Sequence, residues 1–117
     1  MKTDVAHAMA WGLVLALCAG LAACGKTEEE KRRDEEATLT RLAEKYVREK
    51  VREPDAALFR NQFIGKKGAP CGEVNAKDAF GAYIGYQRYI SVARDLTLMA
   101  QDVAPAEFEA SWSQMCR

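Results

Sequence analysis

The sequence changes character abruptly at Cys24. Residues 8–23 form an unbroken apolar run, whereas residues 26–36 contain no large apolar side chain. A helix of this apolar run would rise about 24 Å, which is less than the ~30 Å hydrocarbon core of a bilayer. The run is therefore too short for a typical spanning helix, and its length is typical of the hydrophobic region of a secretion signal.

The four residues that end the run, Leu21-Ala22-Ala23-Cys24, resemble the lipobox of bacterial lipoprotein signals. The resemblance covers roughly the first 25 residues, and the weakly basic start, where Asp4 offsets Lys2, departs from it. It implies attachment of diacylglycerol to the Cys24 thiol, cleavage before Cys24, and acylation of the new terminus by a fatty acid such as palmitate. Two or three acyl chains hold a protein firmly on a membrane, whereas one does not.

The resemblance also implies an address. Gly25 follows the cysteine where an aspartate would imply retention in the inner membrane, so we expect the outer membrane, with the protein facing the periplasm. An ordinary secreted protein and a short N-terminal membrane helix are the alternatives.

The lipobox interpretation reduces the number of possible cysteine pairings. Of the four, Cys18 would leave with the signal peptide and Cys24 would carry lipid, which leaves Cys71 and Cys116. In an oxidising compartment such a pair normally forms a disulfide. Two buried free thiols are the alternative.

Composition limits the chemistry. The chain has 17 basic and 17 acidic residues, and removal of residues 1–23 takes one of each, so bulk attraction to nucleic acid has no support. The only histidine, His7, lies in the segment to be removed. Residues 24–117 therefore hold no histidine for a nucleophile pair or a zinc site, and we expect no enzyme activity, metal or cofactor.

The remaining chain divides into a charged spacer over 24–36 and a small α+β domain over 37–117. Thr27 and Glu30 fit a helix capping box, but the spacer could be helical or disordered. Apolar residues at helical spacing predict a helix over 37–53 that ends before Pro54, and that packs on the domain or pairs with another chain.

The rest of the domain, 54–117, reads as a small antiparallel sheet of three to four strands and a C-terminal helix. Strands are expected over 58–64, 71–77 and 80–93, with residues 95–100 a further strand or a connection. The sequence Gly65-Lys66-Lys67-Gly68 lacks the spacing of a phosphate loop and predicts a hairpin turn. A helix from Pro105 would deliver Cys116 to Cys71.

The long strand predicted over 80–93 has two faces. Alternation places Phe80, Ala82, Ile84, Tyr86, Arg88 and Ile90 on one face, which we expect to lie on a core. The opposite face carries Tyr83 and Tyr89 beside Gly81 and Gly85. It is either a recognition surface or a second face packed under a helix.

The run Cys71-Gly72-Glu73-Val74-Asn75-Ala76-Lys77, followed by the aromatic and glycine-rich strand, is similar to a group of small bacterial envelope proteins, some from prophage-like regions. The resemblance covers about 35 residues. It implies an envelope setting and transfers no catalytic residue.

The candidate binding patch comprises Glu73, Asn75, Lys77, Tyr83 and Arg88. We expect a lipid-anchored, non-enzymatic module that binds an envelope protein or a glycan. The alternative is a periplasmic inhibitor of a hydrolase or an exclusion lipoprotein.

Overall fold

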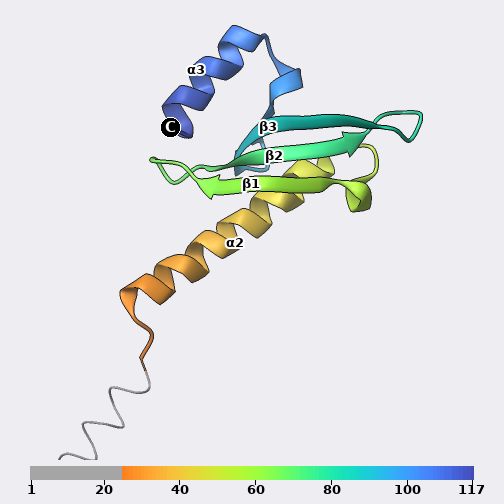
Figure 1. The fold of residues 1–117 in the computed structure, drawn as a ribbon. Helices are drawn as coiled ribbons and strands as arrows, with labels where there is room; N and C mark the ends of the chain where they lie inside the picture. The colour runs from red at the N-terminus through yellow and green to blue at the C-terminus, as the bar shows by residue number, and fades with distance from the viewer. Residues whose placement is uncertain (1–24) are drawn as a thin grey trace, which may run out of the picture. The chain divides into compact units, whose positions relative to one another are not determined.

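A computed structural model describes residues 25–117. The lipobox, Cys24 itself, Cys18 and His7 lie outside the described residues. The described chain is α+β, as predicted (Figure 1). Its elements in order are α2 (Glu28–Glu49), η1 (Pro54–Ala56), β1 (Leu58–Ile64), β2 (Pro70–Lys77), β3 (Tyr83–Ala93), β4 (Leu96–Met99), η2 (Ala100–Asp102) and α3 (Pro105–Met115).

The charged segment begins a helix. The Thr27 hydroxyl accepts a hydrogen bond from the Glu30 amide at 3.2 Å, and a Glu30 carboxylate oxygen accepts one from the Thr27 amide at 3.3 Å. This reciprocal pair is the predicted capping box, and it satisfies two amides that the first turn leaves free. Glu29 and Arg33 add an ion pair four residues apart at 2.7 Å.

The chain divides into two units between Arg33 and Asp34, within α2. Helix α2 starts at Glu28, earlier than the predicted start at residue 37, because its N-terminal cap at Thr27 lies upstream of the apolar stripe. It also ends earlier, at Glu49. There Lys50 and Val51 donate to carbonyls three residues back, which tightens the last turn before Pro54 is reached.

The four strands form one antiparallel sheet in the order β1-β2-β3-β4. Strand β1 has the predicted bounds, and β2 begins one residue earlier than predicted. A turn closed by the Gly65 amide and the Ala69 carbonyl at 2.7 Å joins them, as the glycine and lysine run predicts. Residues 95–100, for which the sequence allows either a strand or a connection, contain strand β4, which pairs with β3.

Each face of the sheet packs on one helix. Ala43 and Val47 of α2 meet Val74, Tyr89 and Met99 on one face. The core on the other face contains Phe108 and Trp112 of α3 and Cys116, which follows the helix. These side chains pack with Ala69, Cys71 and Ile90. Alternate residues of a strand point to opposite faces, so the one sheet contributes to two hydrophobic cores. The α3 ribbon and the sheet it covers are seen in Figure 1.

Tyr89 lies in the α2-side core and is only 1% exposed. Its ring crosses Gly72 on the neighbouring strand, where an added Cβ would lie 2.8 Å from the Tyr89 hydroxyl oxygen. The hydroxyl is 3.2 Å from the Gln62 amide nitrogen, and burial raises the pKa of Tyr89. Of the two alternatives for this face, packing under a helix is confirmed for Tyr89, and an exposed recognition surface is wrong for it. The glycine that accommodates its ring belongs to β2.

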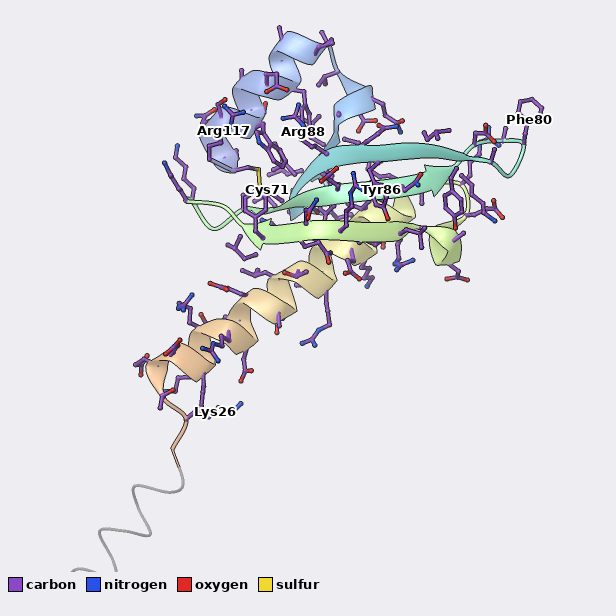
Figure 2. The ribbon with its side chains drawn as sticks, in the orientation of Figure 1. Lys26, Cys71, Phe80, Tyr86, Arg88 and Arg117 are labelled. Atoms are coloured by element: carbon purple, nitrogen blue, oxygen red, sulfur yellow. A yellow bond between two sulfur atoms is a disulfide. The ribbon has the colours of Figure 1, made fainter. Side chains whose placement is uncertain are left out.

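The predicted disulfide joins Cys71 on β2 to Cys116 at the end of α3, with Cα atoms 6.1 Å apart (Figure 2). It closes a loop of 45 residues, which corresponds to about 4 kcal/mol in the chain-entropy model. Both cysteines are buried. The bond therefore fixes α3 over the Cys71 end of the sheet.

The β4 edge of the sheet is capped by side chains. Lys50 donates to the Thr97 carbonyl at 2.8 Å, and the Asp102 carboxylate accepts from the Met99 amide at 2.9 Å. Lys50 and Asp102 also form an ion pair at 2.7 Å. This arrangement occupies backbone groups that an edge strand would otherwise offer to another chain.

Candidate functional site

Helix α3 covers only part of its face of the sheet. In Figure 2, Cys71 lies beneath α3, Arg88 lies at the helix border, and Tyr86 lies farther along the uncovered part. Cross-strand partners share a face, and the register pairs Arg60 with Glu73 and Glu73 with Arg88. We call this uncovered part the open half-face; its residues are Leu58, Arg60, Glu73, Asn75, Lys77, Tyr83, Tyr86 and Arg88.

A ladder of alternating charges crosses the open half-face. Arg60 pairs with Glu73 at 3.2 Å, Glu73 faces Arg88 across the strands, and Arg88 pairs with Glu109 of α3. The Arg88 guanidinium also lies 5.1 Å from the ring centroid of Phe108 and 5.0 Å from that of Trp112. Arg88 is thereby held at the border between sheet and helix, and its hydrogen bond to Glu109 lowers the pKa of that carboxyl.

Asn61 positions the acidic member of this ladder. The β1–β2 register shifts between Arg60 and Phe63, and Asn61 adopts a left-handed conformation there, with φ of 52°. Asparagine tolerates this conformation better than most residues do. Its side-chain amide donates to Glu73 at 2.6 Å, and this bond, followed by the hydrogen bond from Arg60, lowers the pKa of Glu73.

Two tyrosines on the open half-face each carry a cation. The Arg60 guanidinium carbon lies 3.7 Å from the centroid of the Tyr86 ring, and the Lys77 ammonium lies 5.4 Å from that of Tyr83. The Tyr83 hydroxyl donates to the Ala56 carbonyl at 2.8 Å. These contacts hold large side chains in fixed orientations, which reduces the entropy cost of binding.

An irregularity in β3 decides which residues reach this face. Asn75 pairs with Tyr86 but Lys77 pairs with Tyr83, so β3 holds one extra residue there, and Gly85 has φ of 101°. A bulge of this kind shifts the alternation of side chains. The prediction that Ile84 and Tyr86 share a face is therefore wrong, and Tyr83 lies with Tyr86 instead.

The strand predicted from residue 80 begins at Tyr83. Phe80 lies in the turn before it and is 94% exposed, so its expected place on a core is also wrong (Figure 2). The Asp78 carboxylate accepts from the amides of Phe80 and Ala82, which closes the turn. The local hydrogen bonds of Asp78 here replace strand pairing.

The five residues of the predicted patch all lie on the open half-face. Glu73 and Arg88 are cross-strand neighbours, Lys77 faces Tyr83, and the Asn75 side chain accepts from the Gly85 amide at 3.0 Å. Sequence reasoning missed Arg60, Asn61 and Tyr86. Asparagine tolerates the left-handed conformation found at Asn61, but no local pattern places Arg60 on Tyr86.

Within 25–117, no group of three metal-ligating side chains could hold a metal ion. In the same range, no helix has the length and apolar content needed to cross a membrane. The lowered pKa of Glu73 favours a carboxylate that stays ionised in an ion pair rather than one that donates a proton.

Comparison with known proteins yields no match to a family model, a curated protein or a solved structure.

Proposed function

We propose that the chain is a non-enzymatic, lipid-anchored protein of the bacterial envelope that binds another protein through the open half-face. The anchor is lipid attached to Cys24 and inserted in the outer membrane. The rest of the protein faces the periplasm. The observation that carries the binding surface is the rigid pairing of Arg60 with Tyr86 on sheet that α3 leaves uncovered. Arginine and tyrosine are enriched among the residues that dominate protein interfaces.

The surface favours a protein partner over a glycan. Sugars stack on free aromatic faces, but Arg60 lies over the Tyr86 ring and Lys77 over the Tyr83 ring. The outward edge of a stacked guanidinium instead suits a carboxylate. Arg60 is 52% exposed at its side chain, so it can reach such a group while remaining paired with Glu73.

The face is also a better binding surface than the edges of the sheet. The β4 edge is capped by Lys50 and Asp102. The β1 edge is interrupted at Asn61, where the register shifts, and such bulges discourage strand addition. A partner is therefore expected to dock on side chains rather than to extend the sheet.

Crosslinking in cells tests the proposed surface. Tyr86→p-benzoylphenylalanine places a photoreactive ring on the open half-face of the full, anchored chain. Val92→p-benzoylphenylalanine is the matched control, because Val92 lies elsewhere on β3 and is 47% exposed. We expect a discrete protein adduct from position 86 at several times the yield from position 92.

Equal yields from the two positions, or no protein adduct from position 86, would refute the surface. Circular dichroism of each purified variant shows whether it has kept its fold.

A second candidate function, inhibition of an envelope hydrolase, is favoured by one feature, the protruding turn that presents Phe80.

A further inference from the structure

The β2–β3 turn, residues 78–82, holds an aromatic ring in water. Phe80 is 94% exposed and is the most exposed of the large hydrophobic side chains in the described chain. The turn that carries it is tightly closed. The Asp78 carboxylate accepts from the Phe80 amide at 2.8 Å and from the Ala82 amide at 3.0 Å, and the Asp78 amide donates to the Ala82 carbonyl at 2.8 Å.

Gly81 completes the turn with φ of 80° and donates to the Asp78 carbonyl at 3.2 Å. The Phe80 side chain is thus presented from a backbone that is already ordered. A ring presented in this way loses little conformational freedom on binding, while its full apolar surface is still available for burial.

The groove beside the turn carries a small excess of positive charge. The charged side chains that line this groove are Lys50, Arg52, Lys77 and Asp78. Lys50 pairs with Asp102, and the Asp78 carboxylate keeps its negative charge while it accepts hydrogen bonds from backbone amides, so it offsets one of the two remaining cations. Within residues 25–117, neither Arg52 nor Lys77 has a carboxylate at ion-pairing distance, so the rim of the turn carries excess positive charge.

We propose that Phe80 enters an apolar pocket of the partner protein, and that carboxylates border this pocket opposite Lys77 and Arg52. The inference rests on the proposed function and adds the chemistry of the partner. The ring and the open half-face adjoin, because Tyr83 follows the turn directly. A single partner surface with a pocket at its margin would contact both.

A membrane surface fits this geometry less well. Only one ring projects from the turn, whereas stable interfacial binding needs a broader apolar face. The adjoining open half-face holds oriented polar contacts, such as Tyr83 with Ala56 and Asn75 with Gly85, which a fluid lipid surface cannot match.

The test measures binding of the protein identified from the Tyr86 adduct, purified, to the full chain in detergent. Phe80→Ser should weaken binding at least tenfold, and Phe80→Leu should recover most of the loss. Lys77→Glu should weaken binding and reduce its dependence on salt. Val92→Ser, which removes an exposed apolar group elsewhere on β3, should leave the affinity unchanged.

Unchanged affinity in Phe80→Ser would overturn the inference while the Tyr86 adduct leaves the proposed surface standing. Because the ring is exposed, Phe80→Ser should unfold at the same urea concentration as the parent chain, which separates lost binding from lost folding. If position 86 gives no adduct, the proposed function fails, and Phe80→p-benzoylphenylalanine in cells tests the turn directly. A phospholipid adduct or no adduct from position 80 would overturn the inference, whereas an adduct to a protein whose binding Phe80→Ser weakens would support it.

Discussion

At the scale of single residues, Asn61 links backbone geometry to electrostatics. Its left-handed conformation, with φ of 52°, occurs where β1 and β2 change register, and the same residue donates the 2.6 Å hydrogen bond to Glu73. Glycine can adopt this backbone without strain but carries no amide, whereas alanine loses the amide and pays about 1 kcal/mol for the conformation. Asn61→Gly therefore removes the hydrogen bond alone, whereas Asn61→Ala removes the bond and also strains the backbone.

Asn61→Gly should raise the pKa of Glu73 toward its ordinary value of 4.5, because the hydrogen bond from Asn61 is the largest cause of the lowered pKa. Nuclear magnetic resonance titration of the Glu73 carboxyl measures this change. A depressed pKa in the folded state contributes stability above pH 4.5, and this stability is lost as pH falls through the folded pKa. Acidification below pH 4.5 should therefore destabilise Asn61→Gly less than the parent. An unchanged Glu73 pKa would contradict this role.

Gly72→Ala should destabilise the protein by about 1–3 kcal/mol, because overpacking a filled core has that cost. The new Cβ would meet the Tyr89 hydroxyl at 2.8 Å and two ring carbons at 3.0 and 3.1 Å. Urea unfolding measures the loss. In a Tyr89→Phe background the closest of these atoms is gone, so the cost of Gly72→Ala should fall. Equal costs in the two backgrounds would show that Tyr89 does not determine the choice of glycine.

At the scale of elements, the sequence predicts what depends on local pattern. The helix cap at Thr27, the bounds of β1, the turn after Ile64 and the start of α3 at Pro105 all follow from side chains within a few residues of each feature. The register shifts at Asn61 and near Gly85 do not. Their effect on which face a side chain occupies depends on the partner strand, and this is why Ile84 and Tyr83 were assigned to the wrong faces.

The disulfide restrains the end of α3 covalently. Replacing both Cys71 and Cys116 with alanine should lower the free energy of unfolding by about 4 kcal/mol in the chain-entropy model. A domain of this size is stable by only about 5–15 kcal/mol, so the variant should be close to unfolding. Urea unfolding of the variant against the oxidised parent checks this. A loss below about 1 kcal/mol would show that packing of Phe108 and Trp112 holds α3 without the bond.

At the scale of the whole molecule, the sequence predicts a helix at each end and a sheet between them, but not that α3 leaves part of its face uncovered. The predicted patch is brought together because β2 and β3 are neighbours in both sequence and space. Arg60 completes the site from β1, and its place over Tyr86 depends on a pairing between distant segments that no local pattern encodes. Phe80 is likewise exposed because it lies in a turn, whereas the alternation of side chains in the sequence predicts a strand there.

The proposed lipid on Cys24 is the premise on which both the proposed envelope address and the choice of partner rest. The most direct measurement is the mass of the N-terminal peptide from chain purified from bacterial membranes. We predict a peptide that begins at Cys24 and carries diacylglycerol on the thiol and a fatty acid on the new amino terminus, and we predict that Cys24→Ser abolishes this modification. A peptide that begins elsewhere, or an unmodified Cys24 thiol in the membrane fraction, would contradict the lipid anchor.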